Sequence, residues 1–106
     1  MSTPQQIQAA IGITETALYT AFTSTATRGQ LGYLSICNTT GSLLSVDVYY
    51  KNSAGSTSRY LINNAYIPAN GQLDWRGLLV LSTAGESINA IASDVGLDAL
   101  GAVLET

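Results

Sequence analysis

LSVDVYYK, residues 44–51, alternates apolar and polar side chains along its whole length. A period of two is the pattern of a β-strand with one face on a core and the other toward solvent. The turn-forming stretch NSAGS, residues 52–56, follows directly, and residues 57–64 resume the alternation, with Tyr60 and Ile62 expected on the core face. The two segments therefore predict a β-hairpin.

The rest of the chain repeats this rhythm of short apolar runs and turns rich in Gly, Ser, Asn and Thr. We expect about eight strands in an all-β fold, a two-sheet antiparallel β-sandwich of jelly-roll or immunoglobulin-like type. Gly77 is expected to break the strand pattern between residues 72–75 and 78–81. The last segment, residues 97–105, also has helical spacing, but Gly101 disfavours a helix. As a strand it would be apolar on both faces, and so covered by the other sheet or by another subunit.

A length of 106 residues suits one domain. We expect a polar N-terminal arm over residues 1–10, flexible over residues 1–6 and ordered on a neighbour, followed by a single sandwich over residues 11–106. Residues 7–13 could also form a first strand or a loose sheet edge. The arm has no basic residue and no long apolar run, so no secretory signal is expected there.

Composition limits the classes of partner. The chain is 46% hydrophobic and only 10% charged, with a net charge of −3. Its four basic residues, at positions 28, 51, 59 and 76, are far apart in the sequence, whereas phosphate binding needs a cluster. Neither a nucleic-acid partner nor a membrane partner is expected, and a largely neutral surface favours association with other proteins.

Chemistry is also limited. A chain without histidine cannot form a Ser-His-Asp or Cys-His pair. The lone Cys37 lies in an apolar run and is expected to be a small buried side chain. Asp94 and Asp98 flank a turn that resembles a calcium loop but lacks its run of oxygen ligands and closing Glu. We therefore expect no catalytic residue, no metal site and no cofactor.

The aromatic and terminal residues are the remaining candidates for function. Tyr, Trp and Arg are enriched at interface hot spots, although ordinary cross-strand packing explains aromatic residues equally well. Trp75 followed by Arg76 is the first candidate, and a carbohydrate platform is another reading of the same residues. The full set of candidate interface residues is Gln5, Gln6, Ile7, Tyr49, Trp75, Arg76, Leu100 and Leu104.

Several segments occur in an order that resembles small virion proteins of tailed bacteriophages. They are GITETALYT (12–20), LSICNTTG (34–41), VDVYY (46–50), YIPANGQL (66–73), LVL (79–81) and AGESI (84–88). The resemblance covers residues 12–93 and does not extend to the C-terminus. It implies a non-enzymatic β-sandwich of the capsid surface, neck or tail, made in the host cytoplasm and located in the virion.

Resemblance and composition together predict a capsid decoration or cement protein. Such a protein would self-associate, as a homotrimer, and bind the major capsid protein or other virion proteins. A neck, tail or baseplate component is the alternative, and a carbohydrate-binding module that uses Trp75 is a second one.

Overall fold

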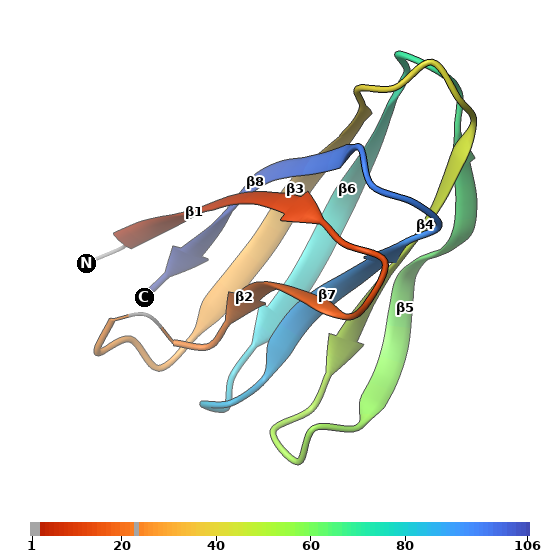
Figure 1. Cartoon of the computed structure of the whole chain (residues 1–106). Coiled ribbons are helices and arrows are strands. Elements are labelled where there is room, and N and C mark those ends of the chain that lie inside the picture. The colour runs from red at the N-terminus through yellow and green to blue at the C-terminus, as the bar shows by residue number, and fades with distance from the viewer. Residues whose placement is uncertain (1–2, 23) are drawn as a thin grey trace.

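The computed structural model describes residues 3–22 and 24–106 and contains eight strands in two antiparallel sheets. The strands are β1 (Thr3–Ile11), β2 (Thr16–Thr20), β3 (Gly29–Asn38), β4 (Leu44–Lys51), β5 (Thr57–Ile67), β6 (Gln72–Leu81), β7 (Ser87–Ala92) and β8 (Leu97–Glu105). Sheet A has the order β1-β8-β3-β6 and sheet B the order β2-β7-β4-β5. The predicted all-β sandwich is confirmed (Figure 1).

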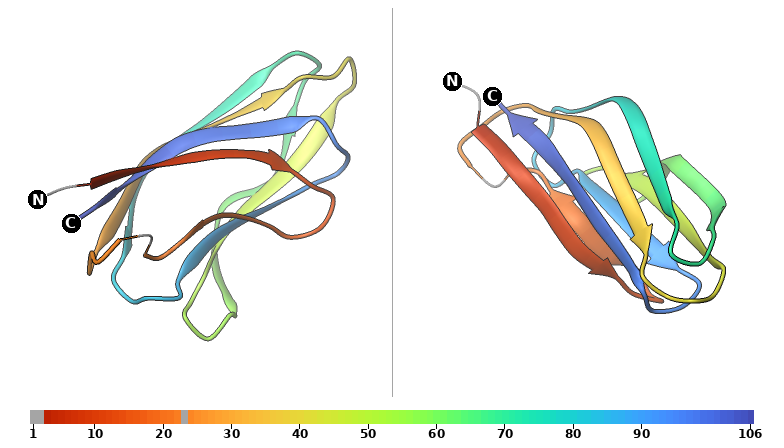
Figure 2. Two further views of the ribbon diagram at one scale, coloured as in Figure 1. Left: turned by 60° about the vertical axis from the view of Figure 1, so that its left-hand side comes forward. Right: turned by 90° about the horizontal axis from the view of Figure 1, so that it is seen from above.

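The strand pairs are nested in the sequence. β4 pairs with β5, β3 with β6, β2 with β7 and β1 with β8, all antiparallel. The predicted hairpin of residues 44–51 and 57–64 is the innermost pair and is confirmed. Rolling this long nested hairpin into two sheets gives a jelly roll, the first of the two sandwich types predicted. In the right-hand view of Figure 2, sheet A lies in front of sheet B, with its strands side by side in the order β1-β8-β3-β6.

The core lies between the two sheets and is filled by every second side chain along each strand, the one that points inward. Leu34 and Ile36 on β3 and Val48 on β4 are all 0% exposed. Partly buried side chains of β4, β5 and β6, such as Tyr50 and Leu73, pack around this core. The period-two pattern of the sequence thus separates a buried face from an outer face on each sheet.

The prediction of a flexible N-terminal arm is wrong for the residues that the structure describes. Thr3–Ile11 forms β1 and pairs with β8 along its whole length, from Thr3 with Glu105 to Ile11 with Leu97. Ile7 and Ile11 are buried in the core because they alternate with polar residues that face outward. Met1 and Ser2 lie outside the described residues.

Register shifts correct three details of the predicted pattern. Gly77 does not break the strand, because β6 is continuous from Gln72 to Leu81. The register of the β3–β6 pairing shifts beside Gly32 instead. A shift in β2 buries both Leu18 and Tyr19, which strict alternation would place on opposite faces. Shifts between β4 and β5 turn Tyr60 outward, opposite Tyr49, so it does not share the core face with Ile62. Each bulge moves a side chain across the sheet.

The C-terminal segment is a strand, as predicted. Ala99 and Val103 of β8 face the core, whereas Leu100 and Leu104 face outward and are 50% and 39% exposed. Both leucines are therefore only partly covered by the rest of the described chain. Cys37 also corrects its prediction, because it lies on the outer face of sheet A, paired with Asp98, and is half-buried.

Candidate interaction surfaces

An apolar groove of about 660 Å³ runs across the outer face of sheet A. Its walls are Leu78 of β6, and Leu100 and Leu104 of β8, all of them exposed. Its floor includes Gly32 and Gly101. The remaining lining residues are Pro4, Gln6, Gln30, Tyr33 and Ala102. We call this hollow the sheet A groove.

The sheet A groove has one cation at its edge. The Arg76 guanidinium lies 4.8 Å from the centre of the Tyr33 ring, in a cation–π contact. On the same strand, Asp74 accepts hydrogen bonds from Gln72 at 2.8 Å and from the Tyr33 hydroxyl at 3.4 Å. The hydrogen bond from Gln72 is the first cause that lowers the pKa of Asp74, so this carboxyl is charged at neutral pH.

The structure brings half of the predicted interface residues to this face. Gln6, Leu100 and Leu104 line the sheet A groove, and Arg76 stands at its edge. These residues come from β1, β8 and β6, which are far apart in the sequence and meet only in the sheet. Gln5 pairs with Val103 on the inward side of the β1 edge and is half-buried.

The other three predicted residues are covered by their own chain. Ile7 is a core residue, 0% exposed, because it occupies an inward position of β1. Trp75 also points inward, pairs with Leu34 and packs against the core. Its ring comes within 3.0 Å of where a side chain at Gly77 would begin. Trp75 is therefore partly buried against its own core, which argues against a flat carbohydrate platform at this residue.

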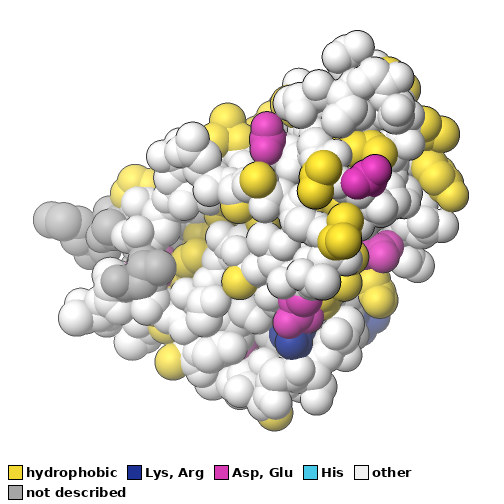
Figure 3. Space-filling model, viewed as in Figure 1, with side chains coloured by type: hydrophobic (Ala, Val, Ile, Leu, Met, Phe, Trp, Pro, Cys, Tyr) yellow, Lys and Arg dark blue, Asp and Glu magenta, His cyan; other side chains and the backbone are white. Residues whose placement is uncertain are grey.

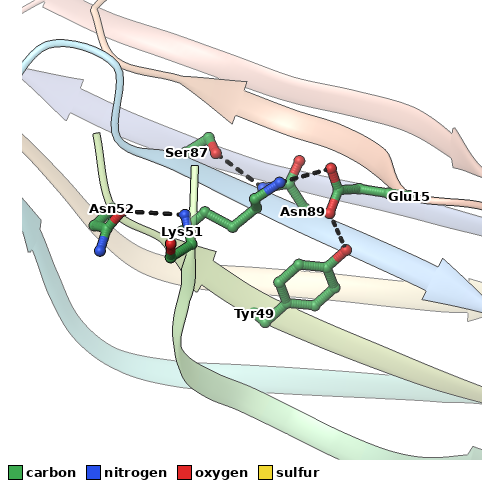
Figure 4. A network of polar contacts seen from close by, with 7 residues as sticks. Glu15, Tyr49, Lys51, Asn52, Ser87 and Asn89 are labelled. Atoms are coloured by element: carbon green, nitrogen blue, oxygen red, sulfur yellow. Dashed lines mark hydrogen bonds and ion pairs between the residues drawn. The ribbon is translucent and has the colours of Figure 1, made fainter. Parts of the chain in front are cut away.

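Tyr49 faces outward on sheet B but is only 4% exposed, because a polar network covers it (Figure 4). The Tyr49 hydroxyl donates to Glu15 Oε1 at 2.5 Å, and Lys51 Nζ donates to Glu15 Oε2 at 2.9 Å. The Tyr60 ring packs beside Tyr49 with its centroid 5.6 Å away. Asn89 lies next to Tyr49 on β7 and donates to Ser87 Oγ at 2.9 Å. The network attaches the β1–β2 loop to sheet B.

A second polar cluster fastens the end of the chain. Glu105 is 0% exposed, and it accepts hydrogen bonds from the Tyr19 hydroxyl and, at 2.6 Å, from Ser24 Oγ. Tyr19 belongs to sheet B and Glu105 to sheet A, so the contact crosses the sandwich. Sequence alternation could not identify this pair, because it joins residues 86 positions apart.

Both clusters shift the acidity of their tyrosines. Burial raises the pKa of Tyr19 and of Tyr49 well above the usual value near 10, and the hydrogen bond to a glutamate adds to it in each case. The pKa of Glu15 moves the other way, lowered first by the Tyr49 hydrogen bond and then by Lys51.

These shifts predict a loss of stability in alkali. Below a pH of about 10 both phenols are neutral in the folded and the unfolded chain, so their hydrogen bonds contribute fully to the free energy of unfolding. Above that pH the unfolded chain ionises first, and the free energy of unfolding falls as the pH rises toward the folded pKa values. Urea unfolding between pH 8 and pH 11.5 measures this slope. A double variant with Tyr19→Phe and Tyr49→Phe should show a shallower slope, and an unchanged slope would refute the assignment.

The described residues contain neither a candidate metal site nor a candidate membrane-spanning helix. Residues 3–22 and 24–106 contain no cluster of three or more Cys, Asp or Glu side chains able to hold a metal ion. Within the same residues, no helix is long and apolar enough to cross a membrane. Sequence reasoning missed Leu78, Tyr33 and Gly32 as surface residues, because strand register rather than hydropathy places them at the groove.

Similar proteins were found by comparison of folds and not by comparison of sequences. No family model and no curated protein matches this chain. The crystal structure of the VP2 subviral particle of infectious bursal disease virus has a TM-score of 0.55 at 14% identity, over 98% of this chain and 32% of that one. The Gx strain of the same virus gives a TM-score of 0.55 at 14% identity, over 97% and 32%. This chain therefore spans about a third of the viral chains.

A third structure matches over nearly its whole length. The Bacillus endospore appendages, described as disulfide-linked pili, have a TM-score of 0.53 at 15% identity, over 100% of this chain and 87% of that one. The fold is shared with subunits of two kinds of assembly. Identities this low establish likeness of fold alone.

Proposed function

We propose that this protein is a structural subunit of a virus particle that acts through self-association and through contacts with other virion proteins. The observation that carries the proposal is the sheet A groove. Leu78, Leu100 and Leu104 expose apolar surface on a chain with only 10% charged residues. Apolar patches of this kind mark protein interaction sites. The likeness of fold to VP2 in a subviral particle supports a virion role.

The more specific proposal is a capsid decoration or cement protein of a tailed bacteriophage, in the form of a homotrimer. The segments quoted from residues 12–93 support the phage origin. A protein that binds only the assembled shell stabilises that shell by mass action, by about 2.7 kcal/mol per site at a free concentration 100-fold above Kd. No bond is made or broken, so no catalytic group is needed.

A pilus subunit is the competing function that one observation favours. The endospore appendage chain matches almost end to end, unlike the viral chains. Continuous disulfide linkage along a fibre needs at least two cysteines in each subunit, whereas these 106 residues contain one. A single thiol can join only two copies, which favours the virion role over a disulfide-linked fibre.

Binding to assembled shells tests the proposed function. Purified protein is mixed with shells of the parent particle that lack it, and the shells are sedimented, heated and imaged by electron microscopy. We expect stoichiometric binding over the whole shell and a higher temperature of shell disruption. Density at a single vertex or along the tail would instead identify a neck, tail or baseplate component. Failure to associate with any part of the particle would contradict a virion role.

A further inference from the structure

One end of the sandwich carries a second apolar surface. Four loops cross between the sheets there, at residues 12–15, 39–43, 68–71 and 93–96, and we call this surface the loop end. Three of the loops expose a large aliphatic side chain at 61–66% of its area: Ile13, Leu43 and Val95. None of the large exposed hydrophobic residues identified in the described chain lies in the loops at the opposite end.

The loops of the loop end are joined to one another. Thr39 N donates to Gly96 O at 2.9 Å, and Asn70 N donates to Thr40 O at 3.0 Å. Ala92 N, at the start of the β7–β8 loop, donates to Gly12 O at 2.9 Å. These backbone bonds tie the four loops together and fix the positions from which the apolar side chains project. Figure 3 shows hydrophobic side chains beside acidic ones around this end.

The sheet A groove lies toward the other end of the molecule. It is lined by Pro4 near the start of β1 and by Leu104 near the end of β8, and both positions are remote from the loop end. With a long axis of 42 Å, one chain cannot bring its own loop end into its own groove. The two apolar surfaces can meet only between copies.

The charges of the two surfaces are complementary. Asp94, beside Val95, is exposed and has no ion pair among residues 3–22 and 24–106, whereas Glu15 in the same region pairs with Lys51. Arg76 stands at the groove edge, where Asp74 balances part of its charge. The loop end thus carries an exposed acidic group, and the groove edge carries a cation. Two grooves placed together would bring no exposed acidic group of the loop end to either Arg76.

We propose that the loop end of one copy binds in the sheet A groove of a second copy. This inference rests on the proposed function, which it deepens by naming the partner and the two contacting surfaces. The contact is heterologous, so each copy has one groove and one loop end to offer. When the same contact is repeated from copy to copy, the copies form either a closed ring or an open filament. The proposed homotrimer is such a ring.

Complementation between two variants tests the proposal. Val95→Asp disables the loop end and leaves the groove intact, whereas Leu100→Asp disables the groove and leaves the loop end intact. Both side chains are exposed, so neither change should disturb folding, and circular dichroism checks this. Tyr66→Asp, at a residue 63% exposed on sheet B, is the matched control. Light scattering and analytical ultracentrifugation give the mass of each protein and of the mixture.

We expect wild type and the Tyr66 control to be oligomeric and each single variant to be monomeric, with self-affinity weakened about 30-fold or more. An equimolar mixture of the two variants should form dimers of one copy of each, because one intact contact remains between them. A second pair of variants, Arg76→Asp and Asp94→Arg, should each weaken assembly and restore it when combined in one chain.

Other results would overturn the proposal. If Leu100→Asp is monomeric but Val95→Asp assembles like wild type, the grooves meet each other instead. A mixture that stays monomeric would also exclude the heterologous contact. Shell binding by a protein that is monomeric at all concentrations would overturn only this inference and leave the virion role standing. Assembly that follows the proposal without shell binding would overturn only the virion role.

Discussion

Gly101→Val is expected to lower the free energy of unfolding by about 3 kcal/mol, the upper part of the usual range for overpacking. Gly101 lies in the middle of β8, where a side chain would begin 2.7 Å from the Tyr33 carbonyl oxygen and 3.2 Å from Leu34 Cδ1. A backbone oxygen cannot turn away as a side chain does. β8 would have to move away from β3, which weakens the centre of sheet A and deforms the floor of the groove.

Chemical denaturation of this variant beside Gly41→Val measures the effect. Gly41 has nothing within 4 Å of the position of a side chain, and its backbone is not in the left-handed region, so its substitution should change stability by less than about 0.5 kcal/mol. Equal losses in the two variants would show that close approach at Gly101 is not the cause.

Tyr19→Phe is expected to cost about 2 kcal/mol. The change removes one hydroxyl and leaves the buried Glu105 carboxylate with one donor fewer, and hydrogen bonds to charged groups contribute about 1.5–3 kcal/mol. The loss falls on the contact that ties the end of β8 in sheet A to β2 in sheet B. Hydrogen exchange at the two strand ends should rise together with the loss of stability.

Tyr66→Phe is the matched control, because Tyr66 is 63% exposed and its hydroxyl makes no hydrogen bond found among the described residues. Its unfolding midpoint should stay within error of wild type. A Tyr19→Phe protein with the same midpoint as this control would mean that the carboxylate recovers its bond from water.

Some of the interaction surface could be predicted and some could not. Leu100 and Leu104 could be predicted, because the last strand is apolar on both faces and a two-layer fold covers only one face of each strand. The apolar residues of the other face must then lie on the outer surface. Trp75 was predicted as an anchor on residue type alone, but its position in β6 turns it inward. Arg76, the next residue, necessarily faces outward, since neighbours along a strand point to opposite sides.

The sequence by itself determined that this protein is an all-β sandwich, that residues 44–64 form a hairpin, and that the chain has no histidine for a Ser-His-Asp or Cys-His pair. Those conclusions are local, because a period of two and a turn can be recognised within a short window, and a missing residue type is missing in any fold. Only the tertiary structure decided that β1 joins β8, that bulges turn Tyr60 outward and bury Tyr19, and that Leu78, Leu100 and Leu104 share one groove. The physical reason is register. A shift of one residue in register moves a side chain to the other face of a sheet. The register depends on the partner strand, which is remote in the sequence.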